Sequence, residues 1–109
     1  MYYPDEWCLV RIEGTDPHWR VFGSWRGGYL NGDSWRLNSG VSSVQLTGSE
    51  KQILAFSGHS GSVYECSIHA QGIRSPYNSG VLNDMAEKSQ GTMLTVEPMS
   101  VEDILEIDW

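Results

Sequence analysis

Through the first two thirds of the chain, apolar and polar residues alternate with a period of two. The first such stretch places three apolar residues on one face, Cys8, Val10 and Ile12, and a mixed set on the other, Trp7, Leu9, Arg11 and Glu13. Successive side chains of a β-strand point to opposite faces, so this period is typical of a strand. The pattern predicts a strand over 7–13 with an apolar inner face and a mixed outer face.

Similar segments recur about every ten residues, separated by turns rich in Gly, Asn, Asp and Ser. They predict strands over 18–25, 34–37, 41–47, 52–57 and 62–68, with 34–47 forming one broken strand or two short ones. Turns this short join antiparallel neighbours, because parallel strands need much longer crossovers. We therefore expect a mostly antiparallel sheet, either a meander or a partly closed barrel.

The pattern changes after residue 72. Apolar residues at helical spacing predict a helix near residues 80–90, with Ser79 as its N-cap and Gly91 at its end. A strand is expected over 92–97. Ser100, followed by the acidic residues Glu102 and Asp103, predicts the start of a short C-terminal helix. The expected fold is an α+β single domain spanning residues 1–109.

The alternation also assigns a core. Its expected members are Val10, Ile12, Trp19, Val21, Ile53, Leu54, Phe56, Tyr64, Cys66, Ile68, Leu94 and Val96. The two cysteines, Cys8 and Cys66, each alternate with apolar neighbours, which favours buried reduced thiols. At 109 residues, the chain is long enough to build one hydrophobic core.

The charge balance disfavours nucleic acid as a partner. Seven basic and 14 acidic residues give a net charge of −7, and phosphate backbones repel such a chain. The first 47 residues are nearly balanced, with four bases against five acids. No apolar run approaches the roughly 20 residues of a membrane span, and no secretory signal precedes the first strand. We expect a cytoplasmic protein without a membrane partner.

Two further motifs favour structural roles. Cys66 and His69 have the C-x-x-H spacing of some zinc ligands, but positions i and i+3 of a strand face opposite ways. The segment Gly58-His59-Ser60-Gly61 has the composition of a hairpin turn and departs from the G-x-S-x-G elbow. We expect no metal and no cofactor.

One set of residues suggests a surface site. The pair Trp-Arg occurs three times, at 19–20, 25–26 and 35–36, and a Gly-rich loop over 26–33 separates the last two. The candidate binding or interface residues are Trp25, Arg26, Tyr29, Asp33 and Trp35. Trp, Tyr and Arg are enriched at interface hot spots. The competing interpretation buries each Trp and exposes each Arg, because neighbours on a strand face opposite ways.

Two classes of function stay open. One is a non-enzymatic binding module whose partner is a second copy in a homodimer, another protein or a small molecule. The alternative is a small hydrolase or transferase with a shallow cleft around Asp33, His59 and Ser60. An enzyme needs a base within hydrogen-bond reach of a nucleophile, and no spacing in the sequence indicates such a pair. The sequence therefore favours binding.

Residues 25–40, WRGGYLNGDSWRLNSG, and 60–66, SGSVYEC, resemble a group of small hypothetical bacterial proteins found among the mobile gene cassettes of integrons. The similarity covers about residues 5–85. It implies a bacterial accessory protein that folds independently. The group has no assigned activity, so the resemblance carries over no catalytic residue.

Overall fold

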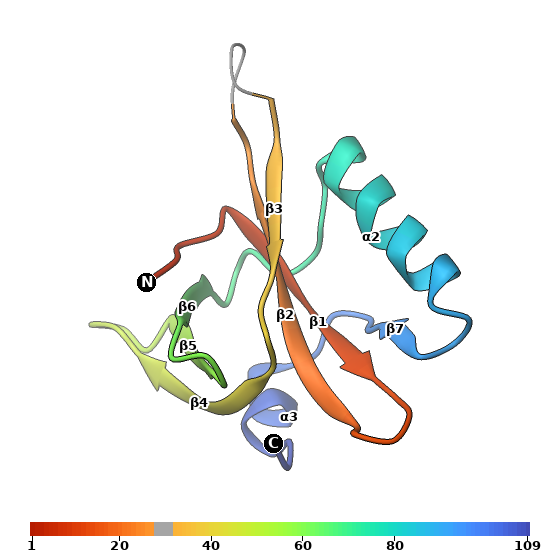
Figure 1. Cartoon of the computed structure of the whole chain (residues 1–109). Helices are drawn as coiled ribbons and strands as arrows, with labels where there is room; N and C mark the ends of the chain where they lie inside the picture. The colour runs from red at the N-terminus through yellow and green to blue at the C-terminus, as the bar shows by residue number, and fades with distance from the viewer. Residues whose placement is uncertain (28–31) are drawn as a thin grey trace.

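A computed structural model of the chain describes residues 1–27 and 32–109 (Figure 1). Its described residues form two antiparallel sheets. The first has the order β3-β2-β1-β7 and comprises β3 (Ser34–Leu37), β2 (His18–Trp25), β1 (Glu6–Ile12) and β7 (Met93–Thr95). The second has the order β4-β5-β6 and comprises β4 (Val41–Thr47), β5 (Ile53–Gly58) and β6 (Val63–Ser67). Within residues 1–27 and 32–109, the helices α2 (Pro76–Lys88) and α3 (Val101–Leu105) complete the predicted α+β fold.

The chain passes from the first sheet to the second at a corner over 38–40. Asn38 donates its N–H to the Val21 carbonyl (3.0 Å), and its side-chain oxygen accepts the Val21 N–H (2.8 Å). Gly40 has φ +132°, and a Cβ there would lie 2.6 Å from the His59 ring. This corner divides the expected meander between two sheets, and these do not close into a barrel over the described residues.

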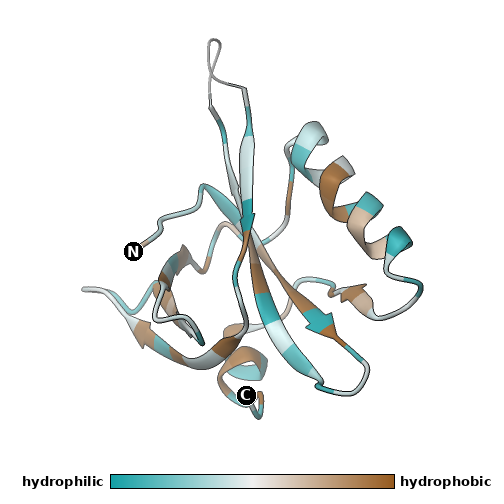
Figure 2. Cartoon of the chain, viewed as in Figure 1, coloured by the Kyte–Doolittle hydropathy of each residue, from teal (hydrophilic) through white to brown (hydrophobic). Residues whose placement is uncertain are grey.

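Strand β1 is buried on both faces, so the predicted mixed outer face is wrong. Trp7 and Leu9 join the cluster between the two sheets, while Cys8 and Val10 join a second cluster with Leu82 of α2. β1 lies between β2 and β7, with the second sheet against one face and α2 against the other. Figure 2 shows the hydrophobic residues of α2 and β1 at this junction.

The helix near 80–90 is present, but it begins earlier than predicted. Ser75, not Ser79, is the N-cap, and its hydroxyl accepts the Asn78 N–H (3.2 Å). Pro76 occupies the first helical position, where its missing N–H costs nothing. The C-terminal helix starts as predicted, with the Ser100 side chain accepting the Asp103 N–H (3.1 Å). No helix in the described part of the chain is long and apolar enough to cross a membrane.

The core prediction is confirmed at its centre and wrong at β7. Six predicted residues are buried, Val10, Val21, Leu54, Phe56, Tyr64 and Cys66. Five are half-buried, Ile12, Trp19, Ile53, Ile68 and Val96. In β7 the buried and exposed positions are the opposite of those predicted. Met93 is buried and Leu94 is 45% exposed, because only Met93 reaches the cluster beneath α2.

Both thiols are free and buried, as the sequence predicts. Burial raises the pKa of Cys8 to about 12. Burial and the nearby Glu65 carboxylate likewise raise the pKa of Cys66. Both thiols therefore stay protonated near neutral pH, as small apolar residues of the core.

Candidate binding groove along strand β3

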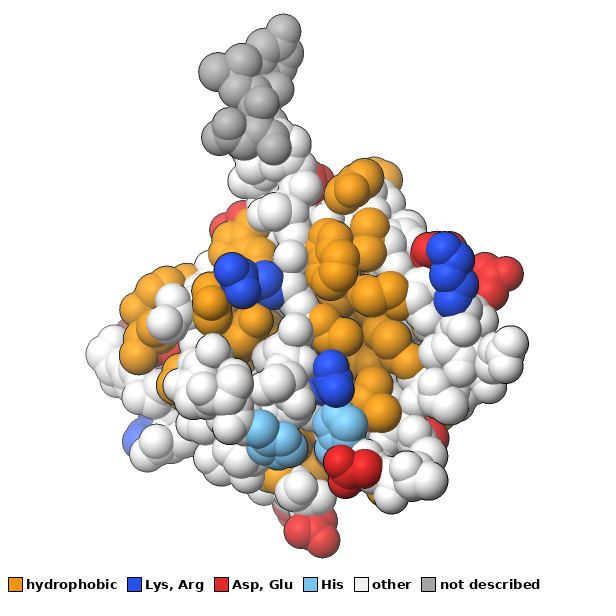
Figure 3. Space-filling view, viewed as in Figure 1, with side chains coloured by type: hydrophobic (Ala, Val, Ile, Leu, Met, Phe, Trp, Pro, Cys, Tyr) orange, Lys and Arg blue, Asp and Glu red, His pale blue; other side chains and the backbone are white. Residues whose placement is uncertain are grey.

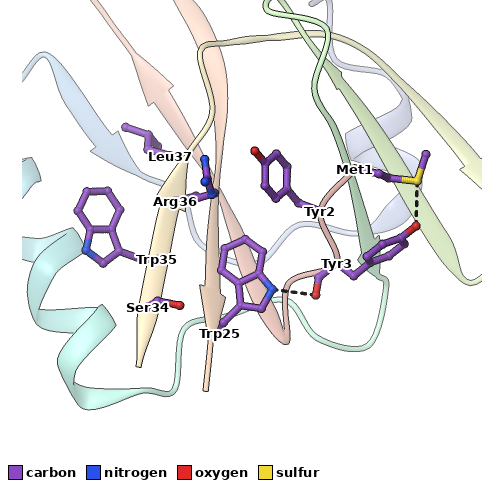
Figure 4. Close-up of a pocket in the computed structure, with 8 residues that line it drawn as sticks. All are labelled: Met1, Tyr2, Tyr3, Trp25, Ser34, Trp35, Arg36 and Leu37. Atoms are coloured by element: carbon purple, nitrogen blue, oxygen red, sulfur yellow. Dashed lines mark hydrogen bonds between the residues drawn. The ribbon is translucent and has the colours of Figure 1, made fainter. Parts of the chain in front are cut away.

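A groove of about 770 Å³ runs along β3, one of the two outer strands of the four-stranded sheet (Figure 4). Eight residues line it, from the N-terminal segment, the end of β2 and β3: Met1, Tyr2, Tyr3, Trp25, Ser34, Trp35, Arg36 and Leu37. Its volume lies within the range of ligand sites, and half of its lining residues are aromatic. We call it the β3 groove.

Strand β3 sends side chains to both of its sides. Figure 4 shows Arg36 pointing toward Tyr2, whereas Trp35 and Leu37 point the opposite way. The Trp35 ring stacks on Phe22 of β2, with centroids 5.7 Å apart and planes 7° from parallel. Trp35 is still 37% exposed. One side of β3 is therefore a half-open aromatic wall above the cluster under α2.

The other side is a cluster of aromatic rings with one cation. The guanidinium carbon of Arg36 lies 4.5 Å from the centroid of the Tyr2 ring, a cation–π distance. Tyr2 also packs on Tyr64 (4.9 Å) and edge-on to Trp25 (6.3 Å). Burial raises the pKa of Tyr64, although the Arg36 charge acts in the opposite direction. The phenol of Tyr64 is therefore neutral, and the cluster carries the positive charge of Arg36.

The backbone edge of β3 is open. Asn38, just after the strand, donates its N–H to β2, and backbone groups alternate in direction along a strand. The N–H and C=O groups of Trp35 and Leu37 consequently point away from β2. Over residues 1–27 and 32–109, no strand pairs with this edge. Figure 3 shows hydrophobic side chains gathered on both sides of the backbone of β3.

Arg36 is the one charged side chain among the lining residues. Four ion pairs join described residues, namely Arg11–Glu13, Arg26–Glu6, Arg74–Glu6 and Lys88–Asp84. Arg36 belongs to none of them, so within the described chain its charge is balanced by no carboxylate at contact distance. The groove is locally cationic in a chain of net charge −7.

A buried carboxylate fixes the framework beside the groove. Glu6 of β1 accepts bonds from the guanidinium groups of Arg26 (3.2 Å) and Arg74 (3.3 Å), and from the Arg74 N–H (2.9 Å). Burial alone raises the pKa of Glu6, but these bonds and the charge of Arg26 outweigh it and lower that pKa overall. The ionised carboxylate ties the segment before α2 to the end of β2.

A second polar network joins β3 to α2. Asp33 accepts a hydrogen bond of 2.5 Å from the Ser75 hydroxyl. The side-chain amide of Asn78 donates to the Ser24 hydroxyl (2.7 Å) and to the Ser34 carbonyl (2.8 Å). The start of β3 is thus connected to α2 by side-chain hydrogen bonds, in addition to its backbone pairing with β2.

The residues predicted as a site divide into three groups. Trp25 and Trp35 line the β3 groove, whereas Arg26 and Asp33 lie beside it in the Glu6 and Ser75 networks. Tyr29 falls outside the described residues. Sequence reasoning did not select Tyr2, Tyr3 or Arg36. The third Trp-Arg pair contained a signal for Arg36, but the aromatic pair at the start of the chain gave none for its distant contacts.

The residues of the alternative catalytic site lie at opposite ends of β3. Asp33 precedes the strand and bonds Ser75, whereas the ring of His59 lies beside Gly40 and 6.3 Å from the His18 ring. Ser60 accompanies His59, and its N–H donates to the Ser39 hydroxyl (3.2 Å). Four residues of strand extend over roughly 13 Å, so the carboxylate does not reach the imidazole. Among the described residues, no group of three or more His, Cys, Asp or Glu is placed to hold a metal ion.

Comparison with known proteins found no relative. No protein-family model, no curated protein and no solved structure matches this chain. The functional argument therefore rests on the geometry of the site.

Proposed function

We propose that this protein is a non-enzymatic binding module and that the β3 groove is its binding surface. One observation carries the proposal: an unpaired strand edge with aromatic side chains on both sides and a cation without a carboxylate partner in the described chain. Exposed backbone donors and acceptors, aromatic area and Arg are the chemical features used at interfaces.

The polar groups around the groove favour binding over catalysis. The closest pairing of a hydroxyl with a carboxylate is Ser75 with Asp33, but Ser75 is 3% exposed and its oxygen already caps α2. A nucleophile so enclosed does not meet a substrate. His59 and Ser60 lie at the far end of β3 from Asp33. These positions do not support the hydrolase or transferase alternative.

Several properties remain predictions of the sequence. Self-association as a homodimer, a cytoplasmic location and a bacterial accessory role belong to this group. The resemblance to integron cassette proteins motivates the last.

Two tyrosines of nearly equal exposure offer a matched test. Tyr3 is 62% exposed and lines the groove, whereas Tyr77 is 63% exposed and lies on α2 outside it. The wild-type protein is screened by NMR with small aromatic carboxylates and by selection from phage-displayed random decapeptides. We expect binders whose affinity falls with Tyr3→Ala and not with Tyr77→Ala, at unchanged melting temperature. Binders equally affected by both variants, or no binder of either kind, would contradict the proposal.

A further inference from the structure

The outer strands of the two sheets differ in how their edges are protected from pairing with a further strand. The edge of β6 is covered by Tyr2, whose N–H donates to the Val63 carbonyl and whose carbonyl accepts the Glu65 N–H, both at 2.8 Å. β4 has a register shift between Val41 and Ser43, and β7 is only three residues long. Coverage, irregularity and shortness all protect sheet edges. Among the outer strands of the described chain, only β3 combines regular pairing with large apolar side chains on both sides.

We infer that the β3 groove takes an extended acidic segment of another protein, which adds to β3 as a further strand and places a carboxylate on Arg36. This inference rests on the proposed binding function and names the occupant of that same groove. The outward N–H and C=O groups of Trp35 and Leu37 offer four backbone hydrogen-bonding groups to an added strand. Strand addition to an open edge is a recurring mode of peptide recognition.

The two walls of the groove set the pattern of the added strand. Side chains of neighbouring strands share a face at each paired position. The residue opposite Arg36 therefore faces the side of Tyr2 and Trp25, and its neighbours face the side of Trp35 and Leu37. This arrangement selects an acidic residue between two apolar ones.

The positive charge of Arg36 favours an acidic segment over a second copy of the chain as the occupant of the groove. A two-fold antiparallel pairing that uses the outward groups of β3 aligns Trp35 with its own copy, Trp35 with Leu37 of the copy, or Leu37 with its own copy. The second alignment sets Arg36 directly opposite Arg36, and the other two set the two arginines diagonally on one face. Like charges at such positions destabilise strand pairing. An acidic strand instead supplies the carboxylate that Arg36 lacks within the described chain.

The net charge of −7 does not prevent this binding. At physiological ionic strength, exposed charges more than about 8 Å apart are largely screened. A carboxylate seated beside Arg36 is governed by that cation at contact distance. The acids of the C-terminal segment belong to a different part of the sequence and do not line the groove.

The test uses the full chain and the phage-displayed decapeptides. We expect the selected peptides to share an acidic residue flanked by apolar ones. Arg36→Gln should lower the affinity of the best peptide about tenfold, the effect of losing one charged hydrogen bond. Arg36→Glu should shift the selection toward lysine, while Arg11→Gln, which changes an arginine that does not line the groove, should change neither result.

Strand addition is tested on the peptide, so that the fold of the protein is untouched. The amides of the best peptide are N-methylated one at a time. Methylation at alternate positions should abolish binding and methylation at the intervening positions should be tolerated, because every second amide of an added strand faces its partner. A helical or irregular peptide would show no such alternation.

The remaining outcomes separate the two proposals. If aromatic carboxylates bind the groove but no peptide is selected, the binding function stands and strand addition is wrong. If peptides bind with no dependence on Arg36 or no alternation on methylation, strand addition is also wrong. A dimer in sedimentation equilibrium that displaces the peptides would make the second copy the occupant and overturn the inference. If neither class of probe binds, both proposals fail.

Discussion

The N-terminal segment contacts two outer strands, β6 and β3, in different ways. Within the described residues it forms backbone hydrogen bonds with β6 but only side-chain contacts with β3. Tyr2 makes two backbone hydrogen bonds to the edge of β6 and lays its ring against Tyr64. Toward β3 it offers only the face of that ring, to the guanidinium of Arg36. The first edge is completed within the chain. The second has side-chain contacts but no backbone partner within the described residues.

The difference shows what each edge requires of the sequence. An unpaired edge invites association with other chains, and charged residues placed on it limit that risk. Arg36 meets this requirement at β3 because it opposes pairing with an identical strand. The same charge favours an acidic strand, so protection from self-pairing and selection of a partner have one physical origin.

The largest loss of stability is expected on truncating Trp7, a core side chain that lies between the two sheets. Trp7 is fully buried, packs against Phe56 and donates its indole N–H to the Ser67 carbonyl (2.7 Å) at the end of β6. Trp7→Ala should lower the free energy of unfolding by about 3–5 kcal/mol, as for other large core truncations. Urea unfolding measures this value. A loss below about 1 kcal/mol would mean that the sheets are not held together by this side chain.

The covered edge is tested by removing its backbone donor. Tyr2→Pro abolishes the bond to the Val63 carbonyl together with the contacts of the ring, and it should cost about 2 kcal/mol. Tyr2→Phe keeps the ring and the backbone, and it should change stability by less than about 0.5 kcal/mol. Equal stabilities of the two variants in urea unfolding would show that the edge of β6 does not need this cover.

The stability of the protein should depend on pH through Glu6, whose hydrogen bonds to Arg26 and Arg74 hold the segments beside the β3 groove. Its pKa in the folded chain lies below the ordinary value of 4.5, so its contribution to stability is present above that value and is lost as pH falls through the folded pKa. Glu6→Gln should lower stability at pH 7 by about 1–2 kcal/mol and reduce the decline on acidification. If the stability of the wild type and that of the variant fell equally as the pH is lowered, this role of Glu6 would be wrong.

The sequence predicted the strands well, and it selected some of the residues that line the candidate groove. Period two located strands through β6 because alternation is a local property, and Ser100 marked α3 for the same reason. It could not show that β1 is buried on both faces, since that depends on the second sheet and α2 arriving from distant parts of the chain. The contact of Tyr2 with β6 joins residues about 60 positions apart, and no local pattern encodes it. The Trp-Arg pairs drew attention to Trp25 and Trp35, which line the β3 groove, but Arg36, which faces it, was not selected.

The smallest effect is expected at the open edge itself. Leu37→Pro removes an N–H that points away from β2, so its stability should lie within about 1 kcal/mol of Leu37→Ala. Arg36→Pro removes an N–H that points toward β2, and it should cost about 3 kcal/mol. Urea unfolding of the three variants checks the order. If Leu37→Pro were as unstable as Arg36→Pro, the N–H of Leu37 would have a hydrogen-bond partner and the edge of β3 would not be open.

Amide hydrogen exchange at β3 tests the central claim most directly. In the free protein, the amide of Glu65, bonded to Tyr2, should be protected, whereas those of Trp35 and Leu37 should exchange rapidly. With the selected acidic peptide at saturation, Trp35 and Leu37 should become protected while Glu65 changes little. Protection of both β3 amides before any peptide is added, or rapid exchange that persists at saturation, would contradict an open edge that binds a strand.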